Sequence, residues 1–79
     1  METIARNEAE KQAQTFLEQE RYRNSPLAHT YVIFVIGGKI GAALFEAGYS
    51  FDSLSHEERQ NIAREALVRV GYPDMEKGV

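Results

Sequence analysis

The residues that could carry chemistry in this sequence are few, since it has two histidines and no cysteine. Asp52 and His56 are four residues apart, but one carboxylate and one imidazole do not complete a metal site. Ser53 and Ser55 offer hydroxyls beside His56, yet sequence neighbours seldom have the geometry of a nucleophile and its base. His29 lies in the first turn of a predicted helix, where a hydrogen-bonded or partly exposed histidine is the ordinary state. We therefore predict no catalytic residue, no metal site and no cofactor.

A glycine cluster in the middle of the chain favours packing over ligand binding. Gly37, Gly38 and Gly41 lack the spacing of a phosphate-binding P-loop. Glycines inside a helix cost about 1 kcal/mol each relative to alanine, and close contact with another helix offsets that cost. That helix is either the first helix of the same chain or the same helix of a second copy. The predicted self-association residues are Phe34, Gly37, Gly38, Gly41, Ala42 and Phe45.

These residues need helices to position them, and the first two helices are predicted from spacing and caps. Residues 2–22 form a polar helix whose apolar stripe is mostly alanine. Ser25-Pro26 is a typical helix start and Gly48 a typical stop, which predicts a second helix over 26–47. The β-branched and aromatic run 30–36 is the composition of a strand and leaves an α+β alternative open. We favour the helix because a lone strand would have no second strand to pair with.

The third helix has the clearest local signals. Ser55 and Glu58 form a capping-box pattern, and Gly71 before Tyr72 and Pro73 ends the helix, which predicts residues 56–70. Both later helices end in the pattern Leu-x-x-x-Gly-Tyr, so Tyr49 and Tyr72 are expected to pack on the leucines five residues before them. We predict a partner-binding surface where these two stops and their linker come together. Its expected anchors are Tyr49, Phe51 and Tyr72.

Together these elements predict an all-α domain over residues 1–73 with a mobile tail at 74–79. The middle helix is apolar on nearly every side, and two short amphipathic helices cover it poorly. We therefore predict a bundle of three helices that is completed by a second subunit, as a homodimer or higher homo-oligomer.

Composition restricts the environment and the class of partner. A net charge of −3 has the wrong sign for a phosphate-binding surface. The longest uncharged run, 24–38, is shorter than the roughly 20 apolar residues that cross a bilayer. The lack of cysteine and of a secretory signal predicts a cytoplasmic protein. We expect neither nucleic acid nor a membrane as its partner.

The function predicted from these observations is that of a small non-enzymatic protein-interaction or regulatory module. An inhibitor encoded by a phage or another mobile element is a narrower version of this hypothesis. Two alternatives stay open. Residues 39–70 have the outline of a helix-turn-helix that binds nucleic acid, and the chain could also be a structural subunit of a larger assembly.

Overall fold

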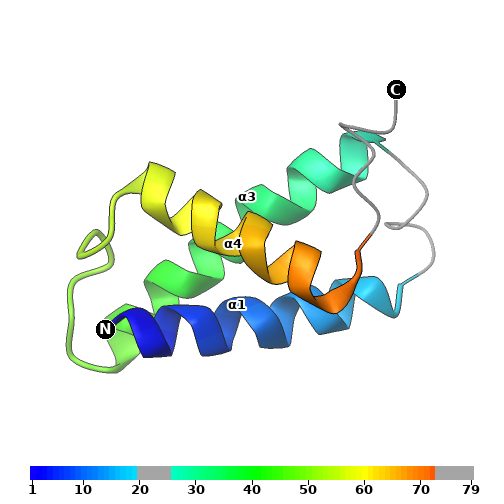
Figure 1. Ribbon diagram of the computed structural model, residues 1–79. Coiled ribbons are helices and arrows are strands. Elements are labelled where there is room, and N and C mark those ends of the chain that lie inside the picture. Colours follow the sequence, from blue (N-terminus) through cyan, green and yellow to red (C-terminus); the bar gives the residue numbers. More distant parts are fainter. Residues whose placement is uncertain (20–25, 73–79) are drawn as a thin grey trace.

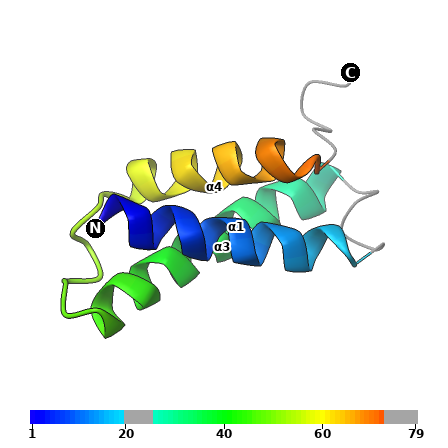
Figure 2. The same ribbon diagram turned by 60° about the horizontal axis from the view of Figure 1, so that its bottom comes forward.

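Over the residues that the structure describes, the protein is a bundle of three helices. The computed structural model describes residues 1–19 and 26–72, and within these ranges all regular secondary structure is helical. The helices are α1 (Glu2–Leu17), α3 (Pro26–Glu46) and α4 (His56–Val70), and each packs against the other two. Figures 1 and 2 show α1 and α4 side by side, with α3 crossing them. The all-α prediction is confirmed.

Helix α1 contacts the core through its alanines. Ala5, Ala9 and Ala13 are fully buried at four-residue steps, which brings the α1 backbone close to its neighbours. The helix ends at Leu17 and not near residue 22 as predicted. The apolar stripe reaches Leu17. The next described residues, Glu18 and Gln19, are polar, so they add no apolar side chain that could pack a further helical turn against the core. Residues 20–22 lie outside the described ranges.

Helix α3 begins at Pro26, as its capping pattern predicts, and contains the run that resembles a strand. Val32, Ile36, Ile40 and Leu44 are fully buried at four-residue steps and form the largest part of the core. The strand alternative for 30–36 is therefore wrong. Helix formation satisfies the backbone of this buried segment within itself, and that outweighs the modest β-propensity of its side chains.

Helix α4 has the predicted start and end. The Ser55 Oγ accepts a hydrogen bond from the Glu58 backbone N–H, and the Glu58 carboxylate accepts one from the Ser55 N–H, both at 3.1 Å. Gly71 ends the helix with a φ of 83°. The Tyr72 N–H donates to the Leu67 carbonyl at 2.9 Å, which completes a Schellman motif.

The same motif ends α3. Gly48 has a φ of 95°, and the Tyr49 N–H donates to the Leu44 carbonyl at 2.9 Å. Residues 47–55, here called the connecting segment, then lead to α4. The predicted tail at 74–79 lies outside the described residues.

Candidate functional site

The outer side of α3 exposes a continuous apolar surface. Its members follow one another at steps of three or four residues and so share one face of the helix. Tyr31, Phe34 and Phe45 are 53%, 62% and 69% exposed, and Gly38 and Ala42 lie exposed between them. We call these five residues the α3 outer face. It presents large aromatic side chains at both ends and a notch of small residues in the middle.

The structure divides the predicted self-association residues into two groups. Phe34, Gly38, Ala42 and Phe45 lie on the α3 outer face, whereas Gly37 and Gly41 are buried inside the bundle. Gly37 and Gly41 lie next to other residues of the same chain, so a second copy cannot contact them.

The close contacts of the buried glycines differ from the intramolecular alternative predicted from sequence. A Cβ added to Gly37 would lie 3.9 Å from the Arg59 Cβ, and one added to Gly41 would lie 2.6 Å from the Phe51 ring. The neighbours are therefore α4 and the connecting segment, and not the alanine stripe of α1. Gly41 leaves room for the Phe51 ring, which packs where a side chain at position 41 would otherwise be.

Arg59 organises the connecting segment from its place on α4. Its guanidinium is buried and donates to the carbonyls of Leu54 at 2.8 Å and Phe51 at 3.0 Å. It also contacts the exposed Asp52 carboxylate at 3.2 Å and lies 4.7 Å from the centroid of the Phe51 ring. One side chain thus satisfies two carbonyls that the segment leaves without helical partners and holds the Phe51 ring over Gly41.

The three predicted anchors of a partner-binding surface do not come together in the structure. Tyr49 and Phe51 are 43% and 40% exposed at the end of α3, next to the α3 outer face. Tyr72 is only 4% exposed, and its ring lies 5.8 Å from that of His29, near the beginning of α3. The 21 residues of α3 span about 32 Å, so Tyr72 lies at the opposite end of the bundle.

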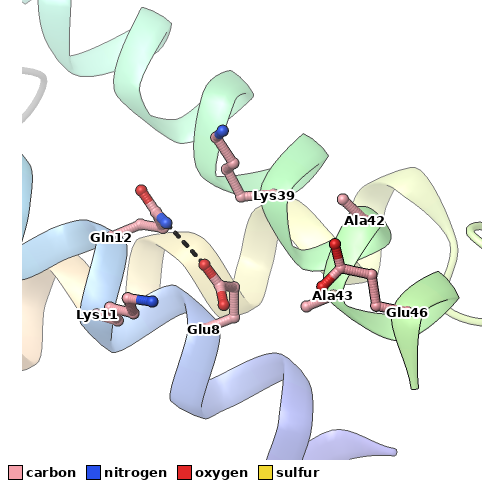
Figure 3. Close-up of a pocket in the computed structure, with 7 residues that line it drawn as sticks. All are labelled: Glu8, Lys11, Gln12, Lys39, Ala42, Ala43 and Glu46. Atoms are coloured by element: carbon pink, nitrogen blue, oxygen red, sulfur yellow. Dashed lines mark hydrogen bonds between the residues drawn. The ribbon is translucent and has the colours of Figure 1, made fainter.

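A shallow hollow borders the α3 outer face on the α1 side. Its volume is about 250 Å³, and it is lined by Glu8, Lys11, Gln12, Lys39, Ala42, Ala43 and Glu46. Figure 3 shows Lys11 and Lys39 toward the start of α3 and Glu46 toward its end. Gln12 donates to the Glu8 carboxylate at 2.7 Å. The hollow is smaller than most ligand pockets, and its lining carries charges of both signs, with Lys39 and Glu46 at its two ends.

The polar residues considered for chemistry have structural partners. Asp52 pairs with Arg59, while the His56 ring packs edge-on against Phe34 with 6.2 Å between the ring centroids. Asp52 and His56 therefore have different partners. Ser55 caps α4, and the Ser53 Oγ accepts the Ser50 N–H at 3.0 Å. Among the described residues, no group of three potential metal ligands converges.

Helix α3 is also long and apolar enough to cross a membrane. The stretch Ala28–Glu46 has 19 residues and a mean hydropathy of 1.5, and 44% of it is buried inside the bundle. The buried helix of a soluble bundle has the same properties. Lys39 and Glu46 would each lie unfavourably at or near hydrocarbon depth.

Comparison with protein-family models, curated proteins and solved structures finds no match to this chain.

Sequence reasoning missed two residues of this region, and one of them had a detectable signal. Arg59 precedes Ala63 and Ala66 at steps of four and three residues, so a charged side chain stands on the buried stripe of α4. Tyr31 starts the α3 outer face. Its exposure could not be read from a helix that is apolar on nearly every side.

Proposed function

We propose that this chain is a non-enzymatic protein-interaction module that binds its partner through the α3 outer face and the adjoining aromatic residues of the connecting segment. The observation that supports this most is the exposure of Phe34 and Phe45 on one helical face. The largest apolar patch on a small soluble protein is often its contact site. Aromatic side chains also carry a large share of binding energy at interfaces.

The nucleic-acid alternative has less support. A helix-turn-helix joins its helices by a turn of roughly three or four residues, whereas the connecting segment runs from Ala47 to Ser55. The start of α4 also carries Glu57 and Glu58, which repel phosphates.

The proposal is tested with two matched substitutions. Phe45 on α3 and Val68 on α4 are apolar and almost equally exposed, at 69% and 70%. Wild-type protein, Phe45→Asp and Val68→Asp are immobilised, and the proteins that each retains from a lysate of the source cells are quantified. We expect the same partner with wild type and Val68→Asp, and at least a tenfold loss, about 1.4 kcal/mol, with Phe45→Asp.

Circular dichroism and urea unfolding of the same preparations test whether both variants remain folded, which we expect because both positions are exposed. A partner retained equally by Phe45→Asp would contradict the proposal. A partner lost only with Val68→Asp would move the binding surface to α4.

A further inference from the structure

We infer that the α3 outer face binds the same face of a second copy of this chain, as an antiparallel pair of α3 helices centred between Ala42 and Ala43. This inference rests on the proposed function and names the partner. Two independent features of the face, its shape and its charge, select the same pairing.

The first feature is the shape of the face. Gly38 and Ala42 leave a notch one helical turn long, and Phe45 projects beside it with 69% of its surface exposed. In an antiparallel pair, Phe45 of each copy can lie in the notch of the other. That requires Phe45 to be level with the point midway between Gly38 and Ala42, which centres the pair on the Ala42–Ala43 peptide bond.

The second feature is the charge along the α1 edge of the face. Lys39 and Glu46 are separated by two helical turns on this edge and border the hollow at its two ends (Figure 3). A two-fold axis through the Ala42–Ala43 bond places Lys39 of each copy level with Glu46 of the other. The axis also superposes the same edges of the two faces, so two ion pairs form. A parallel pair would instead place Lys39 level with Lys39.

The same axis also accounts for the aromatic residues on the α4 edge. The Phe51 ring packs at the level of Gly41, so the axis brings the Phe51 rings of the two copies level with each other to within one helical turn, and each ring is 40% exposed in the single chain. Aromatic pairs of this kind stabilise interfaces. Arg59 holds the Phe51 ring in place before the copies meet.

The size of the face indicates how stable such a pair is. With about 200 Å² for each phenylalanine, the exposed parts of Phe34, Phe45 and Phe51 amount to about 350 Å² per copy. Specific interfaces usually bury about 800 Å² per partner. The aromatic area is less than half of that value, and the small residues and the stems of Lys39 and Glu46 add only part of the difference. We therefore expect a small, reversible dimer interface.

The association is measured by sedimentation of the full chain over a series of micromolar concentrations. We expect a monomer–dimer equilibrium that Phe45→Asp weakens at least tenfold and that Val68→Asp leaves unchanged. A chain that stays monomeric, or a dimer that ignores Phe45→Asp, would overturn the inference. A monomer that instead sediments with phosphatidylcholine–phosphatidylglycerol vesicles would overturn it and assign the face to a membrane.

Charge reversal tests the pairing itself. Lys39→Glu and Glu46→Lys should each weaken the dimer, because each places like charges opposite one another, and the double variant should restore it. Urea unfolding of the dilute monomers separates this effect from changes within the chain. If the double variant is as weak as the single ones, the proposed axis is wrong.

Cysteine cross-linking tests the direction of the helices in a protein that has no cysteine of its own. Ala42→Cys lies beside the axis, where two copies can form a disulfide on oxidation. Tyr31→Cys lies on the same face, but its two copies are about 35 Å apart along the antiparallel helices. Cross-linking through position 42 alone is expected. Equal cross-linking through position 31 would show a parallel pair and overturn the inference.

The two proposals fail separately. If the chain is monomeric but its partner still depends on Phe45, the proposed function stands and the second copy is excluded. If a Phe45-dependent dimer forms and no other protein depends on this face, the module binds only itself.

Discussion

At the scale of single residues, Arg59 shows how a buried charge supports a surface loop. Its guanidinium donates to two backbone carbonyls that a helix or strand would otherwise satisfy, and it does so with only 5% of its surface exposed. The exposed carboxylate of Asp52 adds a third contact of lesser value, because solvent screens an ion pair in which one member is exposed. The carbonyls therefore account for most of the role of Arg59.

This division of roles leads to the first prediction. Arg59→Ala should lower the free energy of unfolding by about 3 kcal/mol, since it leaves buried carbonyls without donors and a cavity in their place. Asp52→Asn should cost less than about 1 kcal/mol. Urea unfolding measures both, with the exposed Arg64→Ala as the control for loss of charge on α4. Equal decreases in the free energy of unfolding for Arg59→Ala and Asp52→Asn would show that Arg59 stabilises the chain through the ion pair and not through the carbonyls.

Gly38 and Gly41 of α3 provide the second prediction, because a methyl group added to Gly41 would clash with a neighbour and one added to Gly38 would not. A methyl group at Gly38 would meet no described atom within 4 Å, whereas one at Gly41 would lie 2.6 Å from the Phe51 ring. Gly38→Ala should therefore stabilise the dilute monomer by about 0.5–1 kcal/mol through helix propensity. Gly41→Ala should lower stability by about 1 kcal/mol, because it displaces the ring from Arg59.

The Phe51→Ala background is the control for this prediction. With the ring removed, Gly41→Ala should stabilise the chain as Gly38→Ala does, because only helix propensity remains. A stabilising Gly41→Ala in the wild-type chain would contradict the close contact. Sequence could not distinguish the two glycines, since a residue without a side chain leaves no hydrophobic pattern to show which way it faces.

At the scale of elements, the ends of the helices were easier to predict than their faces. Ser55, Gly48 and Gly71 act through hydrogen bonds to neighbours a few residues away, so their roles are written locally in the sequence. The end of α1 was predicted too late. It depends on whether the core supplies a surface beyond Leu17, and that is a tertiary property.

The third prediction concerns the left-handed stop of α4. Gly71 has a φ of 83°, a conformation that costs residues with a Cβ about 1–2 kcal/mol. Gly71→Ala should lower the free energy of unfolding by about that amount, whereas Gly71→Asn should cost less because asparagine tolerates this conformation. Thermal unfolding followed by circular dichroism compares the two. Equal melting temperatures for wild type and Gly71→Ala would show that α4 ends in another way.

At the scale of the whole molecule, the arrangement of the helices decides which aromatic residues remain exposed. Tyr49 and Tyr72 follow identical stops, yet one is 43% exposed beside the α3 outer face and the other is buried near His29. Their separation follows from the length of α3 and from how α4 packs against it. The repeated Gly-Tyr pattern gives no information on the length of α3 or on the packing of α4. The three residues predicted as one surface therefore lie at different ends of the bundle.

The exposure of the α3 outer face follows from the number of helices. Among the helices that the structure describes, α1 and α4 pack against α3 and leave the residues of the α3 outer face exposed. The sequence predicted that α3 would need further cover, because its apolar residues occupy nearly all of its circumference. Which of them would be left exposed depended on the packing of α1 and α4.

We propose that the α3 outer face is the binding surface of this chain and that it binds a second copy. Backbone amide chemical shifts, recorded during dilution from high to low micromolar concentration, test it most directly. The predicted result is concentration-dependent shifts at Phe34, Gly38, Ala42, Phe45 and Phe51, with unchanged shifts at Gln14 and Val68. Shifts centred on Gln14 or Val68, or amide shifts that ignore dilution throughout the chain, would contradict the claim.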